Sequence, residues 1–181
     1  MNVLISGGCK NGKTGFAQDI AVRLSGPGKR FYVATMIPYD DEDRARVSKH
    51  ISDRTGMGFE TLEICRNIAS CLEYGGSDST YLVDSVTALL LNEMYPGGFS
   101  ADADPAAVDR CVEGLTEITR NAGGAVFVSD YIYSDAARYD DFTENYRRWL
   151  ASIDRALAGA CDTVIELCAG NVICHKGGLP G

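Results

Sequence analysis

The sequence predicts an α/β fold with a mainly parallel β-sheet flanked by helices. Short apolar runs alternate along the 181-residue chain with segments whose apolar side chains recur at helical spacing, which is the pattern of strand–helix–strand units. Several of these runs are continuously apolar, as expected for strands that are covered on both faces. A glycine-rich turn joins the first run to the first helical segment.

Each element of the first half has its own signal. A strand at residues 3–5 runs into the glycine-rich turn, and a helix at 16–24 ends at a Gly-Pro-Gly stop. A second strand at 30–35 precedes a charged segment at 40–54, in which acids come first and bases later, the order that the helix macrodipole favours. The other elements expected here are a strand at 59–62, a short helix at 67–74, a strand at 81–84 and a helix at 86–94.

The second half begins with residues 96–105, whose prolines, glycines and aspartates predict a mobile loop. A long amphipathic helix at 106–121, a buried strand at 125–129 and a helix at 142–158 follow. Strands at 163–167 and 172–174 close the chain, and the short gap between them favours an antiparallel hairpin at one edge of the sheet. No repeat, low-complexity tract or linker divides the sequence, so we expect a single domain over residues 1–181.

Composition excludes several classes of protein. Hydrophobic residues make up 45% and charged residues 23% of the chain, an ordinary profile for a soluble globular protein. The 17 basic and 25 acidic residues give a net charge of −8, which argues against binding to nucleic acid or to an anionic membrane surface. The apolar runs are far shorter than the roughly 20 residues of a membrane helix, so no membrane insertion is expected. Seven scattered cysteines without a C-x-x-C pair or a signal-peptide pattern predict a cytoplasmic, reducing location.

Residues 7–14 read G-G-C-K-N-G-K-T and match the phosphate-binding pattern G-x-x-x-x-G-K-[ST] at every fixed position. Its glycines allow backbone amides to surround a phosphate, and the start of the next helix adds its positive dipole. Lys13 is expected to reach the outer phosphates and the Thr14 hydroxyl to bind Mg²⁺. The alternative is a glycine-rich turn that matches by chance. The nucleotide contacts predicted from this loop are Gly7, Gly8, Cys9, Lys10, Asn11, Gly12, Lys13 and Thr14.

A phosphate loop of this kind normally works with a metal-orienting carboxylate at the end of a neighbouring strand. Asp84 closes the apolar strand at 81–84 and is the favoured candidate, so Thr14 and Asp84 form the predicted metal site. Asp130, after the strand at 125–129, is the second candidate. Either aspartate could instead cap the helix that follows it.

His50 is one of only two histidines in the chain. It lies four residues after Arg46 and four before Arg54, so in a helix the three side chains share one stripe, beside an apolar stripe of Val47 and Ile51 that could pack on the sheet. Flanking arginines disfavour protonation of the imidazole and could hold phosphates, which suits a nucleophile. The alternative is a solvated charged helix with an incidental histidine.

Together these residues resemble the beginning of a known enzyme family. The loop at 7–14, Y-V-A-T at 32–35, R-V-x-x-H at 46–50 and Arg54 are similar to the start of the bifunctional adenosylcobinamide kinase / adenosylcobinamide-phosphate guanylyltransferases. T-L-E at 61–63 and L-V-D-S-V-T at 82–87 continue the similarity, which is close over the first half of the chain and fainter afterwards.

The resemblance implies two reactions and the residues that serve them. Adenosylcobinamide is phosphorylated with GTP or ATP, and His50 then attacks the α-phosphate of GTP and carries GMP as a phosphoramidate to adenosylcobinamide phosphate. The product is adenosyl-GDP-cobinamide, on the route to adenosylcobalamin. A homo-oligomer, with a trimer favoured, is also implied. The further nucleotide contacts implied by the resemblance are Ala34, Thr35, Met36, Ile51, Ser52, Asp53, Arg54, Glu63 and Asp84.

The second half departs from the family pattern. Residues 130–135 contain no glycine where the family has N-E and a glycine-containing stretch, and Y-R-R at 146–148 and D-R at 154–155 stand where it has F-R-D and N-Q. Losing a glycine changes the available backbone conformations, and exchanging amides for charges alters hydrogen bonding. Two alternatives therefore stay open: a monofunctional P-loop kinase of another small alcohol, and a non-catalytic nucleotide-dependent regulatory protein.

Overall fold

The structure is a computed structural model that describes residues 1–98, 102–133 and 136–180, without the side chain of Arg46. Within these residues the chain forms a seven-stranded sheet in the order β3-β2-β4-β5-β1-β6-β7. All neighbouring strands are parallel except β6 and β7, which pair antiparallel at one edge. The strands are β1 (Asn2–Gly7), β2 (Arg30–Ala34), β3 (Phe59–Glu63), β4 (Thr80–Asp84), β5 (Gly124–Asp130), β6 (Thr163–Cys168) and β7 (Asn171–Lys176).

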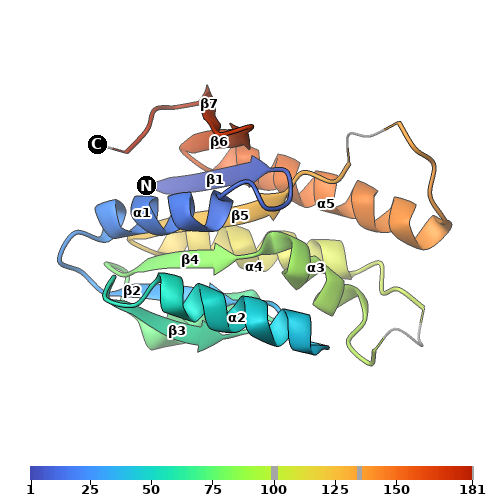
Figure 1. Ribbon diagram of the computed structural model, residues 1–181, viewed down its shortest axis with the longest axis horizontal. Coiled ribbons are helices and arrows are strands. Elements are labelled where there is room, and N and C mark those ends of the chain that lie inside the picture. Colours follow the sequence, from blue (N-terminus) through green and yellow to red (C-terminus); the bar gives the residue numbers. More distant parts are fainter. Residues whose placement is uncertain (99–101, 134–135, 181) are drawn as a thin grey trace.

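Helices cover both faces of the sheet, and the carboxyl ends of the parallel strands meet at one end of the molecule (Figure 1). This arrangement confirms the predicted mainly parallel sheet and its antiparallel edge hairpin. The segment predicted as a helix at 67–74 is a 3₁₀ helix. The helices are α1 (Lys13–Ser25), α2 (Asp41–Asp53), η1 (Ile68–Tyr74), α3 (Val86–Met94), α4 (Ala107–Asn121) and α5 (Asp141–Ala160).

The sheet separates two apolar cores, because its central strands bury both faces. On one face α1 contributes Ala17, Ile20 and Ala21, which pack with β1, β2, β4, β5 and β6. On the other face α3, α4, α5 and η1 pack together, with Leu115 and Leu150 among the fully buried side chains. The continuous apolar runs in the sequence therefore correspond to strands covered on both sides.

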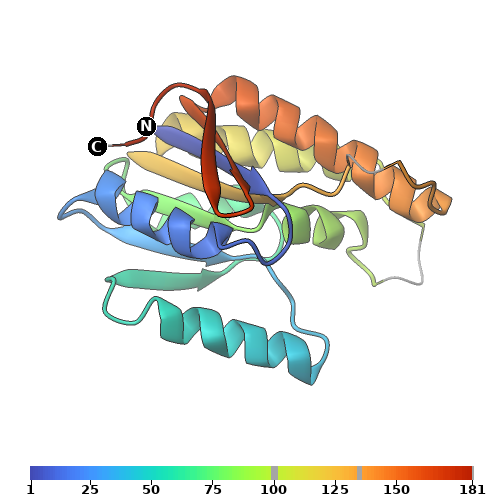
Figure 2. The ribbon, with the colours of Figure 1, turned by 45° about the horizontal axis from the view of Figure 1, so that its top comes forward.

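Helix α2 buries less of its surface than the helices that pack on the sheet. Its predicted polarity is confirmed, since Asp40 caps the helix by accepting from the Asp43 amide at 2.8 Å and acidic residues fill its first turn. Figure 2 shows α2 beyond β3, standing apart from the layered body of the molecule. The predicted packing of its apolar stripe on the sheet is wrong at Ile51, whose side chain is 50% exposed. The helix therefore has little buried surface, and the connections at its ends attach it to the rest of the fold.

Two expectations concern loops. The loop predicted to be mobile at 96–105 falls partly on residues 99–101, which lie outside the described residues, and so do Ser134 and Asp135 of the divergent 130–135 stretch. The described part of the first loop is tied down where the Asp104 amide donates to the Met94 carbonyl at 2.9 Å. Among the helices in the described part of the chain, none combines the length and apolarity needed to span a bilayer.

Candidate functional site

The glycine-rich loop connects β1 to α1 at the carboxyl end of the sheet, and its shape depends on glycine. Gly12 has φ 88° immediately before α1, a left-handed conformation that side chains disfavour. At Gly7 a Cβ would lie 2.5 Å from the Leu167 carbonyl oxygen, so the close approach of β6 excludes any side chain. At Gly8 and Gly12 a Cβ would meet nothing within 4 Å, so the loop is open there. No side chain in the described part of the chain caps α1, which leaves its first amides for a ligand.

Lys13 lies inside this loop and is held there by an acid. Its side chain is only 6% exposed, and its Nζ donates to the Gly8 carbonyl at 2.6 Å and pairs with Asp130 Oδ1 at 2.9 Å. Parallel pairing of β1 with β5 sets Gly7 level with Asp130, which brings this carboxylate to the loop. Asp130 caps no helix, because α5 begins at Asp141 and is capped by Asp140. The second metal candidate is therefore the ionic partner of the loop lysine.

Asp84 and Thr14 meet across the sheet although they are 70 residues apart in the chain. The Thr14 hydroxyl donates to Asp84 Oδ2 at 3.0 Å, and the Tyr32 hydroxyl donates to the same oxygen at 2.6 Å. Asp84 does not cap α3, since Ser85 is the cap residue and accepts from the Ala88 amide. A carboxylate beside a hydroxyl is the oxygen-rich donor set that Mg²⁺ prefers.

Tyr32 is a residue that sequence reasoning missed. Burial, followed by the charge of Asp84, raises the pKa of the Tyr32 hydroxyl well above its usual range. Tyr32 therefore stays protonated and donates to one oxygen of Asp84, which fixes the orientation of that carboxylate. The only signal in the sequence is a hydroxyl-bearing aromatic residue within an otherwise apolar strand.

Arg54 follows the last turn of α2 and turns toward the sheet. Its guanidinium carbon lies 4.1 Å from the centre of the Tyr32 ring, and its Nη2 donates to Thr61 Oγ1 at 2.9 Å. Of the predicted arginine–histidine–arginine stripe, Arg54 is buried and His50 is partly buried, whereas the three residues between them are exposed. The side chain of Arg46 lies outside the described residues. His50 occupies the last turn of α2, partly buried, and its ring makes no hydrogen bond with the described residues.

The other predicted contacts divide into two groups. Thr35 is buried and structural, because its hydroxyl donates to the Ser85 carbonyl and accepts from the Ser85 amide, both at 2.7 Å. Its neighbours Ala34 and Met36 are partly buried at the end of β2, and Glu63 is exposed at the end of β3. The ends of both strands lie at the loop end of the sheet. The second group is exposed at the end of α2. The first group is Ala34, Thr35, Met36 and Glu63, and the second group is Ile51, Ser52 and Asp53.

A buried acid lies beneath the loop end of β5. Asp154 of α5 accepts hydrogen bonds at Oδ2 from the Ser129 hydroxyl at 2.8 Å and the Tyr133 hydroxyl at 3.0 Å. Its Oδ1 has no partner among the described residues. Burial raises the pKa of Asp154 to about 6. A single acid among Leu150, Ile153 and Leu157 on the apolar face of α5 was the available signal in the sequence.

Comparisons with known proteins agree with this geometry. The family model described as cobinamide kinase / cobinamide phosphate guanyltransferase matches residues 3–174. No curated protein matches the sequence significantly.

Among solved structures, an ATPase domain has a TM-score of 0.56 and 13% identity, covering 97% of this chain and 76% of that one. A KaiC-like protein from Pyrococcus horikoshii has a TM-score of 0.51 and 14% identity over 97% and 78% of the two chains. The flagellar accessory protein FlaH from Methanocaldococcus jannaschii has a TM-score of 0.53 and 14% identity over 99% and 80%. At these identities the likeness shows the fold alone, which is that of P-loop NTPases.

Proposed function

The chain belongs to the cobinamide kinase / cobinamide phosphate guanyltransferase family, and we propose that it carries out both reactions of that family in cobalamin biosynthesis. In the first reaction a γ-phosphate passes from GTP or ATP to the hydroxyl of adenosylcobinamide. In the second, GMP from GTP is joined to adenosylcobinamide phosphate to give adenosyl-GDP-cobinamide. The observation that carries the proposal is the convergence of Lys13, Thr14 and Asp84 on one glycine-rich loop within a chain of this family.

The phosphoryl transfer step rests on the loop and its partners. The backbone amides of residues 7–14 bind the nucleotide phosphates, and Lys13 leaves Asp130 to reach the outer ones. Thr14 and Asp84 would hold Mg²⁺, whose charge would offset the charge of the phosphates. Tyr32 keeps the Asp84 carboxylate in place for this role.

The guanylyl transfer step rests on His50. Its imidazole nitrogen forms a bond to the α-phosphorus of GTP while the bond from that phosphorus to the oxygen bridging to the β-phosphate breaks, which releases pyrophosphate. A phosphate oxygen of adenosylcobinamide phosphate then bonds to the same phosphorus, and the phosphorus–nitrogen bond breaks to regenerate the imidazole. Because α2 buries little surface and lies apart from the glycine-rich loop (Figure 2), we expect this helix to move or to serve a neighbouring copy.

The separation of α2 from the loop also favours a second candidate, a kinase that phosphorylates a small alcohol without guanylyl transfer. One labelling experiment separates the two. The protein is incubated with GTP labelled at the α-phosphate and Mg²⁺, and label on the denatured protein is measured. An acid-labile, alkali-stable adduct is expected in the wild type.

The two histidines provide a matched pair of variants for this experiment. His50→Ala should lose the adduct, whereas His175→Ala, which alters an exposed histidine on β7, should keep it. An adduct that survives His50→Ala contradicts the assignment of the carrier. No adduct in the wild type, together with transfer of γ-label to an alcohol, selects the monofunctional kinase.

We further propose a cytoplasmic homo-oligomer, with a trimer favoured by the family. Sedimentation gives the oligomeric state, and mixing two inactive variants tests whether copies cooperate. If His50 serves the loop of a neighbouring copy, mixed oligomers of Lys13→Ala and His50→Ala chains should form the adduct. If each histidine serves its own loop, the mixture stays inactive.

A further inference from the structure

A cavity separate from the glycine-rich loop lies beyond the carboxyl end of β5. It is an open cavity of about 520 Å³, within the range of small-molecule sites, and is formed by residues 137–139 and the first two turns of α5. The charged and aromatic side chains that line it are Arg138, Tyr139, Asp141, Glu144, Arg147 and Arg148. None of them belongs to the glycine-rich loop or to its partners.

Arg147 forms part of the wall of this cavity. Its side chain is buried, its Nε donates to the Ile132 carbonyl at 3.0 Å, and its Nη1 pairs with Glu144 Oε1 at 3.0 Å. Its guanidinium carbon lies 4.9 Å from the centre of the Tyr139 ring. These contacts fix the segment after β5 against α5 and balance the charge of Glu144.

Arg138 and Arg148 differ from Arg147 in their exposure and in their contacts. Both are exposed, and within the described residues neither guanidinium makes an ion pair or a hydrogen bond. The cavity thus carries three guanidinium groups against the two carboxylates of Asp141 and Glu144, a local excess of positive charge on a chain of net charge −8. Planar guanidinium groups match phosphate oxygens with two parallel hydrogen bonds, so an organic phosphate is the ligand class that this lining favours.

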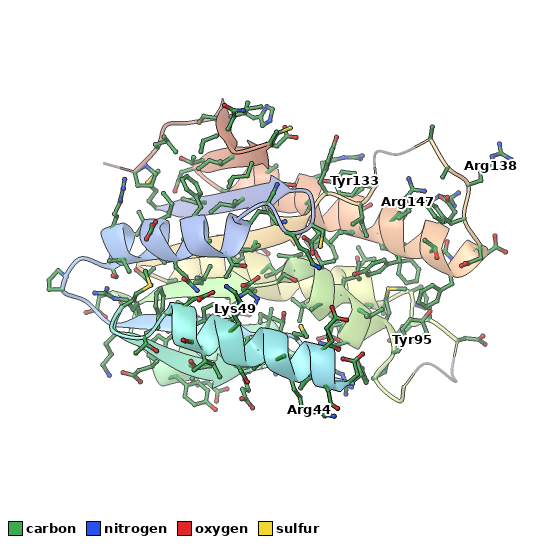
Figure 3. All side chains as sticks on the ribbon, viewed as in Figure 1. Arg44, Lys49, Tyr95, Tyr133, Arg138 and Arg147 are labelled. Carbon is green, nitrogen blue, oxygen red and sulfur yellow. The ribbon has the colours of Figure 1, made fainter. Side chains whose placement is uncertain are left out.

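The position of the cavity relates it to the phosphate loop. The segment that forms it leaves β5 at Asp130, the partner of Lys13, and the Tyr131 amide donates to the Gly7 carbonyl at 3.0 Å. Figure 3 shows Tyr133, Arg147 and Arg138 in succession outward from the end of β5. Ligands of open parallel sheets bind beyond the carboxyl ends of the strands, which is where this cavity lies.

We propose that this cavity is a subsite for a phosphate ester, with Arg138 and Arg148 as its anion-binding groups. The inference rests on the proposed function, because two reactants of that function carry such a group. These are the phosphorylated acceptor and a second molecule of nucleotide. The cavity has room for an organic group beside the phosphate.

Arginine footprinting tests the subsite directly. Phenylglyoxal modifies accessible guanidinium groups, and mass spectrometry gives the rate at each arginine. Adenosylcobinamide phosphate, or GTP added to the Lys13→Ala variant, should slow modification of Arg138 and Arg148 at least fivefold and leave exposed Arg155 of α5 unchanged. Which of the two compounds protects identifies the source of the phosphate.

Three results would overturn the subsite. Unphosphorylated adenosylcobinamide could protect equally, only inorganic pyrophosphate could protect, or protection could rise with protein concentration without ligand because copies contact one another. A double variant supplies a second measurement. Arg138→Ala with Arg148→Ala should weaken binding of the protecting phosphate ester by at least roughly tenfold, against less than twofold for Arg155→Ala. Equal effects of the two variants also reject the proposal.

The failure of this inference can be told from failure of the proposed function. Formation of the guanylyl adduct at His50 is followed in parallel on the wild-type protein with GTP labelled at the α-phosphate, and it is expected to depend on the loop and α2 rather than on this cavity. An intact adduct without arginine protection rejects the subsite alone. Arginine protection without an adduct keeps the subsite and rejects the guanylyl carrier.

Discussion

Two regions of the molecule carry residues expected to bind phosphate, yet they are built in opposite ways. One is the end of the sheet around the glycine-rich loop, and the other is helix α2. At the loop, Lys13 is 6% exposed and ion-paired, and Asp84 accepts from two hydroxyls. On α2, Ile51 is 50% exposed, and the ion pair of Lys49 with Asp53 joins residues of the same helix. One region is preorganised, and the other is a charged helix with little buried surface.

This difference matches what the proposed function asks of each region. Phosphate binding gains from fixed donors, because the cost of arranging them has been met during folding. A residue that carries a nucleotidyl group between two partners must change its position, and a helix with little buried surface opposes that movement least. The contrast therefore supports a fixed nucleotide site served by a movable carrier.

The largest effect is expected at the loop lysine. Lys13→Ala removes the cation that reaches the outer phosphates, so both phosphoryl transfer and adduct formation should fall by about 10³-fold or more. Lys10→Ala, an exposed lysine of the same loop, is the matched control and should change either rate by less than about tenfold. Steady-state rates and adduct yields measure both. Equal losses in the two variants would mean that general positive charge, rather than the position of Lys13, supports the reaction.

Much of the loop end could be predicted from the sequence, because its signals are local. The pattern at 7–14 and the acid that closes the strand at 81–84 identified the groups that the structure brings together, Thr14 and Asp84. What the sequence concealed are contacts set by strand order. Asp130 meets Lys13 only because β5 lies beside β1, and Tyr32 meets Asp84 only because β2 lies beside β4. The apolar stripe of Val47 and Ile51 likewise does not indicate whether a partner surface lies opposite α2.

A matched pair of isoleucines tests whether α2 is as loosely packed as its exposed face indicates. Ile20 of α1 is 2% exposed, so Ile20→Ala should lower the free energy of unfolding by about 2–5 kcal/mol. Ile51→Ala removes the same atoms from α2 and should cost less than about 0.5 kcal/mol. Urea unfolding of both variants gives the values. A large loss for Ile51→Ala would show that α2 packs on the sheet or on another copy in solution.

The packed region also contains an unfavourable charge, which gives a pH-dependent prediction. Because the pKa of Asp154 is raised from 3.8 to about 6 on folding, the native state binds more protons than the unfolded state between these values. Its contribution to the free energy of unfolding therefore falls as pH rises from about 4 to 6 and stays low above that. The full difference is up to about 3 kcal/mol.

Asp154→Asn removes this titration while keeping the shape of the side chain. The variant should lose less stability than the wild type between pH 4.5 and 7.5, as measured by urea unfolding at several pH values. Asp19→Asn, an exposed acid of α1, serves as the control and should follow the wild-type slope. If Asp154→Asn follows that slope too, the carboxyl is solvated or paired in a way that the described contacts do not contain.

The smallest effect concerns the contact that ties α2 to the sheet. Arg54→Ala loses the guanidinium above the Tyr32 ring and the hydrogen bond to Thr61, together worth about 1–2 kcal/mol. Amide hydrogen exchange in α2 should then accelerate roughly tenfold, while exchange in α1 stays unchanged. Tyr32→Phe is the control, since it keeps the ring under Arg54 and removes only the hydrogen bond to Asp84. If Tyr32→Phe loosens α2 as much as Arg54→Ala does, the helix is coupled to the metal-site carboxylate, and the separation between a fixed site and a movable carrier no longer holds.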